Sequence, residues 1–267
     1  MGRPAATTRD ASLSGVLPPP ESPQQKDNLC GPFWAARILR EFGITTWDGE
    51  QIDDDLIALR AGSVLPDTDH DGDLPPGAVS RTSYRYELAK VPAEESGTAS
   101  GSLATAIEAA AAGALRYLPL RGDWTAERVE GLLDGAGQLG DARLIANVRT
   151  GRLWGSRPPL AVLLAELEGR SVPDPTPDWD VGHFVELGEL IRGSGGSLVV
   201  VRDTYPTLGL MGYHLQPPRM LAAALERGDG REGGVLLVVA AEHAGGVHDL
   251  AHRVGLDIGA WNNGTRI

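Results

Sequence analysis

The stretch HFVELGELIRGSGGSLVVVRD, residues 183–203, contains two apolar runs on either side of a Gly-Ser-Gly-Gly segment. Apolar runs rich in β-branched residues are typical of strands, and a short glycine-rich link between them predicts a β-hairpin. Further runs of this kind lie at 143–148 and 234–241, whereas helix signals dominate the chain before them. Helices in the first half and strands in the second half predict an α+β domain.

The rest of the chain is organised around this strand-rich half. Residues 1–23 are rich in Pro, Ser, Ala and Thr without periodicity, so we expect a flexible N-terminal arm followed by a single domain at 24–267. Residues 63–102 are rich in Gly, Pro, Asp and Ser, and we expect them to run over the surface. The expected helices are 31–41, 48–61, 103–112, 125–133 and 218–227.

Composition excludes several classes of function. The formal net charge of −12 opposes binding to nucleic-acid phosphates and anionic membranes, and favours a neutral or cationic partner. No apolar stretch approaches the roughly 18 residues of a membrane span. The first twenty residues lack a basic start followed by an apolar run, so we expect no secretory signal. With a single cysteine and no intramolecular disulfide, a cytoplasmic location is expected.

That single cysteine lies in the stretch SPQQKDNLCGPFWAARIL, residues 22–39. Pro32 has no amide hydrogen and is tolerated only in a first helical turn, so the helix begins beside Cys30, with Asp27 or Asn28 as its cap. A helix N-terminus favours negative charge and therefore a thiolate. The alternative is that Cys30 fills the core, since free cysteines are among the most buried residues.

A cysteine nucleophile needs a base, a group that orients the base and donors for an oxyanion. His183 opens the first strand of the hairpin and Asp203 closes the second. If Ile191 pairs with Ser197, the aspartate lies on the same face as the histidine. If Arg192 pairs with Ser197 instead, Asp203 falls on the other face unless a β-bulge restores it.

These residues resemble those of a known family. The motif Q-x5-C-G-P with Gln24 six residues before Cys30, the motif G-H-F-V-E-L at His183 and the aspartate in V-R-D-T-Y-P are similar to those of papain-like cysteine peptidases. The likeness is greatest to the bacterial peptidases that remove double-glycine leader peptides. The spacing from the cysteine to the histidine is close to the roughly 150 residues typical of papain relatives.

The resemblance implies a papain-like fold, in which an N-terminal helical half packs its catalytic helix on an antiparallel sheet. It implies Cys30 as the nucleophile, His183 as the acid and base, and Asp203 as the orienting group. Gln24 would supply the side-chain donor to the oxyanion, with Gln25 as a competitor for this role, and the backbone amide of Cys30 would be the second donor.

The implied function is hydrolysis of a peptide or amide bond, in a small bacterial natural-product precursor, without a metal or organic cofactor. The alternatives are acyl transfer or cyclisation at the same cysteine, and a papain-like binding protein without activity. The candidate substrate-binding residues adjoin the two motifs and are Gly31, Trp34, Trp179, Asp180 and Gly182.

The loop before His183, DPTPDWDVGH, carries three carboxylates and a tryptophan. We expect Asp174, Asp178, Trp179 and Asp180 to form an acidic, aromatic rim that attracts a basic peptide. Solvated loop charge is the alternative interpretation.

Two other motifs suggest metal sites. DTDHDGD at 67–73 matches the first half of a calcium loop, but Ala78 occupies the position of the bidentate glutamate, which favours a solvated acidic turn. His248 and His252 are one helical turn apart, but HDLAH lacks the glutamate of H-E-x-x-H, which favours an ordinary helix surface.

Overall fold

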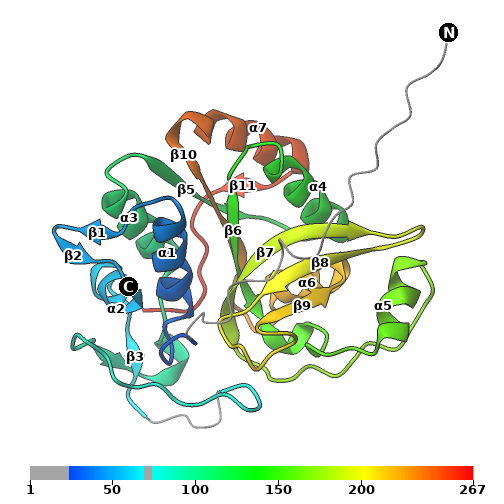
Figure 1. The fold of residues 1–267 in the computed structure, drawn as a ribbon, viewed down its shortest axis with the longest axis horizontal. Helices are drawn as coiled ribbons and strands as arrows, with labels where there is room; N and C mark the ends of the chain where they lie inside the picture. The colour runs from blue at the N-terminus through cyan, green and yellow to red at the C-terminus, as the bar shows by residue number, and fades with distance from the viewer. Residues whose placement is uncertain (1–23, 69–73, 267) are drawn as a thin grey trace.

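A seven-stranded antiparallel sheet forms the centre of the computed structural model, which describes residues 24–68 and 74–266 (Figure 1). The strand order is β11-β5-β10-β6-β7-β8-β9. These strands are β5 (Leu115–Arg121), β6 (Arg143–Arg149), β7 (Gly182–Arg192), β8 (Ser197–Arg202), β9 (Tyr213–Gln216), β10 (Gly234–Ala240) and β11 (Asp257–Ile258). The flexible arm expected at residues 1–23 lies outside the described residues.

Helices cover both faces of the sheet. One face packs on α1 (Cys30–Glu41), α2 (Asp54–Arg60) and α3 (Ser100–Ala110). The other face packs on α4 (Ala126–Ala136), α6 (Pro218–Glu226) and α7 (Ala244–Val254), and α5 (Leu160–Leu167) lies beside β8. None of the helices in the described ranges is long and apolar enough to cross a membrane.

Smaller elements connect these layers. Two short pairs, β1 with β2 and β3 with β4, lie outside the main sheet. Their bounds, and those of the 3-10 helices, are β1 (Thr46–Trp47), β2 (Glu50–Gln51), β3 (Leu65–Pro66), β4 (Lys90–Val91), η3 (Ala93–Glu95), η4 (Thr150–Arg152) and η5 (Ala241–His243).

The continuous apolar run of β10 follows from this two-sided cover. Val235, Leu237 and Val239 pack in the core beneath α4, α6 and α7, whereas Leu236 and Val238 face the α1–α3 layer. Successive strand residues point to opposite faces, so a strand buried on both faces needs apolar residues throughout. Each fully buried aliphatic side chain contributes about 1.5–3 kcal/mol to the free energy of unfolding.

The predicted α+β class is confirmed, and the structure corrects some of the predicted elements. The helix expected at 48–61 begins only at Asp54, because β1 and β2 occupy the preceding residues and the Asp53 side chain accepts the Leu56 amide hydrogen at 2.8 Å. The sequence did not predict β5, whose Pro119 and two arginines obscure the strand pattern, or the short helix α5.

The β7–β8 hairpin adopts the second of the two registers considered. Arg192 pairs with Ser197, and a bulge then shifts the register between Leu187 and Leu190. Gly188 lies in the bulge, where a Cβ atom would come within 3.2 Å of a backbone oxygen of β8. The shift returns Asp203, which follows the last paired residue of β8, to the face that carries the histidine.

The start of α1 also differs from the prediction. Leu29 is the N-cap residue and provides no side-chain cap. Asp27 instead accepts hydrogen bonds from Ser80 Oγ at 2.6 Å and from the Arg81 amide at 3.1 Å. Asn28 has a φ of 62°, a left-handed conformation that asparagine tolerates better than most residues. This turn leads the chain directly into the helix at Cys30.

Candidate active site

Cys30 and His183 line one cavity of about 1090 Å³. The cysteine comes from the first residue of α1 and the histidine from the start of β7, and these two elements pack against each other. Much of the opposite wall is the 80–88 segment. The segment expected to run over the surface therefore covers the loop before Cys30, where Leu65 and Leu88 pack against buried Leu29.

The imidazole of His183 is held between an aspartate and the cysteine. His183 Nε2 lies 3.1 Å from Asp203 Oδ1, and both side chains are buried. Asp203 Oδ1 also accepts the Tyr205 amide hydrogen at 3.0 Å, which fixes the carboxylate. The Cys30 side chain is close enough to His183 to help raise the pKa of the imidazole. Because Nε2 faces the carboxylate, Nδ1 is the ring nitrogen that remains available to Cys30.

Electrostatics favour the charged form of this pair. Burial alone lowers the pKa of His183, but the Asp203 carboxylate and the interactions with Cys30 outweigh burial and raise it above its usual value. Burial raises the pKa of Asp203, but His183, with a contribution from His214, holds it well below its usual range. An imidazolium beside a carboxylate is therefore the stable state near neutral pH.

Trp179, which the sequence singled out, encloses the pair together with Tyr205 and His214, which it did not. The rings of Trp179 and Tyr205 lie 5.0 Å and 5.8 Å from the His183 ring, measured between centroids. His214 Nε2 lies 4.0 Å from the second oxygen of Asp203. Tyr205 follows Asp203 by two residues at the end of β8. Residues two apart in an extended chain point to the same side, so this spacing could have indicated that Tyr205 lies near the site. His214 comes from β9, and no local motif links it to the site.

The two glutamines have different positions. Gln25 is buried and lines the cavity, where its Oε1 accepts the Thr204 hydroxyl at 2.6 Å and its Nε2 donates to Tyr205 Oη at 3.1 Å. The Gln24 side chain instead donates to the Val79 carbonyl oxygen at 2.6 Å and does not line the cavity. The structure therefore places the competitor, Gln25, at the cavity that Cys30 also lines.

The other predicted site residues divide into two groups. Trp179, Asp180 and Gly182 line the cavity, as expected for substrate-binding residues. Trp34 is buried in the core beneath α1 and donates its ring hydrogen to the Phe184 carbonyl oxygen at 3.1 Å. Gly31 is also buried, and a Cβ atom there would lie 3.1 Å from the Leu103 side chain of α3 and 3.3 Å from the Phe184 ring of β7. Neither Trp34 nor Gly31 lines the cavity.

The carboxylates of the acidic rim expected before His183 accept hydrogen bonds from other groups of the chain. Asp180 is the member of the three carboxylates that lines the cavity, and all three accept hydrogen bonds. Hydrogen bonds from arginines lower the pKa of Asp174 and Asp180. The donors are Trp154 Nε1 and Arg219 Nη2 to Asp174 (both 2.8 Å), the Ser156 amide to Asp178 (2.6 Å) and Arg149 Nε to Asp180 (2.5 Å).

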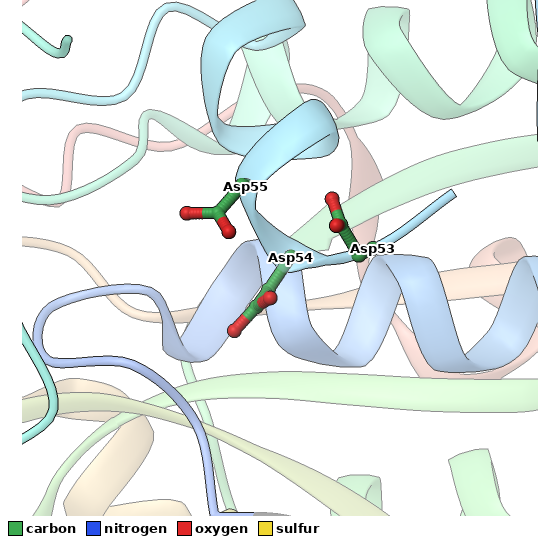
Figure 2. A group of neighbouring side chains, drawn as sticks. All are labelled: Asp53, Asp54 and Asp55. Atoms are coloured by element: carbon green, nitrogen blue, oxygen red, sulfur yellow. The ribbon is translucent and has the colours of Figure 1, made fainter. Parts of the chain in front are cut away.

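Asp53, Asp54 and Asp55 form the one acidic group with spacing suited to a metal ion among the described residues (Figure 2). Their interactions indicate a structural role. Asp53 caps α2, Asp54 accepts the Lys26 amide hydrogen at 3.3 Å, and Asp55 forms an ion pair with the Lys26 ammonium. These contacts anchor the loop that carries Gln25 toward the cavity.

Of the two metal-binding motifs considered in the sequence, the structure describes only the histidine pair in full. The predicted calcium-loop turn includes residues 69–73, which lie outside the described residues. His248 and His252 are exposed on α7, as an ordinary helix surface requires, and the described residues contain no further ligands grouped with them.

Fold and site together define an α+β domain in which Cys30 and His183 line one cavity and buried Asp203 pairs with the histidine. The chain belongs to the family of unknown function DUF6885, whose model matches residues 20–262. A comparison with curated proteins finds no significant match.

The reactivity of Cys30 provides a first prediction. The imidazolium of His183 favours a thiolate at its side, so iodoacetamide should label Cys30 at about pH 6 much faster than a free thiol of pKa about 8.5 would react. The sequence contains one cysteine, so any thiol label is at this position. The rate is measured by intact-mass spectrometry from pH 5 to 9, with His183→Ala as the control. Labelling that rises only above about pH 8 in both proteins would contradict the ion pair.

Proposed function

We propose that this protein is a papain-like cysteine peptidase or amidohydrolase. The observation that carries the proposal is the His183–Asp203 pair at 3.1 Å, with His183 and Cys30 lining the same cavity. A nucleophile, a base and an orienting carboxylate in this order are the parts that covalent acyl chemistry needs.

The reaction uses this chain's own groups in two steps. The Cys30 thiolate attacks the carbonyl carbon, and His183 Nδ1 gives its proton to the leaving amine as the carbon–nitrogen bond breaks. His183 then takes a proton from water as the water oxygen attacks the thioester carbon. The carbon–sulfur bond breaks, which releases the acid and restores the Cys30 thiolate beside the His183 imidazolium. Asp203 holds the imidazole in the required orientation and stabilises its charged form. Gln25 takes the oxyanion role that the sequence assigned first to Gln24.

The substrate class is a peptide. A cavity of about 1090 Å³ is at the upper end of the range for small-molecule sites, so a segment of several residues fits. The loop carboxylates are engaged with their own partners, so the proposal includes no preference for basic peptides. Processing of a small bacterial precursor peptide in the cytoplasm is the context that the sequence motifs favour.

A peptide mixture analysed by mass spectrometry tests this function. The mixture should include sequences with Gly-Gly pairs, and each product mass distinguishes the reaction types. Hydrolysis adds one water across the cleaved bond, whereas transfer to an amine or cyclisation adds none. Products that appear with the wild-type protein and not with Cys30→Ala support the proposal. Retained peptide with no product, together with an unreactive Cys30, would indicate a binding protein instead.

The adjacent glutamines provide a matched pair of variants. Gln25→Ala should lower kcat by about 10²- to 10³-fold, the usual loss when one oxyanion donor is removed. Gln24→Ala should change kcat by less than about threefold, because that side chain is bonded to Val79 outside the cavity. Steady-state kinetics on the cleaved peptide measure both. The reverse order of effects would restore Gln24 to the oxyanion role.

A further inference from the structure

We propose that the hydroxyl of Tyr205 is a second side-chain donor to the oxyanion formed when Cys30 attacks a carbonyl group. This inference rests on the proposed function and adds a catalytic residue that the sequence motifs do not include. It is supported by the position of Tyr205 at the cavity wall and by its hydrogen bond with Gln25.

Tyr205 is buried yet lines the same cavity as Cys30. Its ring is fixed against two others, with centroids 5.4 Å from Trp179 and 5.8 Å from His183. A tyrosine packed in this way presents its hydroxyl in one position, and pre-positioned donors are effective because they need no reorganisation during the reaction.

The direction of the Gln25 hydrogen bonds leaves the tyrosine proton available. Gln25 Oε1 accepts from the Thr204 hydroxyl at 2.6 Å, so the amide nitrogen is the atom that faces Tyr205 Oη at 3.1 Å. A phenol oxygen that accepts from an amide still has its own proton to donate. Among the described residues, no acceptor for that proton is found.

Tyr205 is also close enough to the nucleophile to interact with its charge. Burial is the main cause that raises the pKa of Tyr205 above its usual value, and the charge of Cys30 is the next. The phenol therefore stays protonated throughout the neutral range and keeps a hydrogen to donate. Its hydroxyl lies 3.1 Å from the Gln25 amide nitrogen, and Tyr205 and Cys30 line the same cavity.

The tetrahedral intermediate forms and collapses without another reactant. As the bond between Cys30 Sγ and the carbonyl carbon forms, the π pair of the carbonyl moves to its oxygen. The second Nε2 hydrogen of Gln25 and the Tyr205 hydroxyl donate hydrogen bonds to that oxygen. When the carbonyl re-forms, the bond to the leaving group breaks and the leaving group departs. The phenol keeps its proton throughout.

Two small probes of Cys30 test the inference without knowledge of the natural substrate. p-Nitrophenyl acetate acylates a thiolate through an oxyanion and releases p-nitrophenolate, whereas iodoacetamide alkylates it by displacement at carbon, with no oxyanion. Tyr205→Phe should lower the acylation rate by about 10²-fold and change the alkylation rate by less than about twofold. The alkylation rate also reports whether the variant retains the folded site.

A second comparison separates donation by Tyr205 from simple support of Gln25. In a Gln25→Ala background, Tyr205→Phe should still lower the acylation rate by about tenfold. Equal acylation by Gln25→Ala and by the double variant would overturn the inference, as would equal losses in acylation and alkylation. If wild type and Cys30→Ala release p-nitrophenolate at the same rate, the proposed function itself fails, and Tyr205 has no oxyanion to serve.

Discussion

Cys30→Ala is expected to lower kcat on any cleaved peptide by at least about 10⁴-fold, because no other group can form the covalent intermediate. The sequence contains no second cysteine that could replace it. Alanine suits the first turn of α1, and Cys30 is only partly buried, so the fold should survive. Loss of the nucleophile therefore separates chemistry from stability.

Single-turnover kinetics on the best peptide measure this effect, with thermal unfolding as the check on the fold. Cys30→Ser is the informative companion, since its hydroxyl keeps the shape of the site but is a far weaker nucleophile near neutral pH. Activity in the alanine variant within tenfold of wild type would exclude a thioester mechanism.

Asp203→Asn should lower kcat by about 10²- to 10⁴-fold while the protein stays folded. The asparagine oxygen can still accept the Tyr205 amide hydrogen, so the turn after β8 is preserved. The lost charge is the main factor that raises the pKa of His183 against the effect of burial, so this pKa should fall. Less imidazolium is then present to protonate the leaving amine.

The same variant should also change how activity depends on pH. Activity that needs imidazolium is lost as pH rises through the pKa of His183, so Asp203→Asn should move the alkaline limb of kcat/KM to lower pH. Asp180→Asn is the matched control, because Asp180 lines the same cavity but pairs with Arg149. Its alkaline limb should match that of wild type. A normal profile in Asp203→Asn with a shifted profile in Asp180→Asn would reassign the orienting carboxylate.

Much of this architecture could be predicted locally. The helix at Cys30 was predicted from Pro32, and its start was placed within one residue of the observed start. The strands at 183 and 197 were predicted from β-branched runs on either side of a glycine-rich turn. These predictions succeeded because the backbone restrictions of proline, glycine and β-branched residues act over a few positions.

The interior and the cavity wall were less predictable. Gly31 and Trp34 lie within four residues of Cys30, yet both pack into the core, because β7 lies against this part of α1. The loop carboxylates have partners on α6, on β6 and before α5. Contacts between such distant segments leave no signal in the local sequence.

By itself, the sequence determined a cysteine at a helix N-terminus, a histidine and an aspartate at the two ends of a hairpin, and an α+β domain. The tertiary structure decided which residues meet. The bulge at Gly188 shifts the strand by one residue and so turns Asp203 toward His183, a change that reverses the face of every later side chain. Packing of the loop before α1 against Thr204 and Tyr205 likewise selected Gln25, because neighbouring residues on an extended chain point to opposite sides.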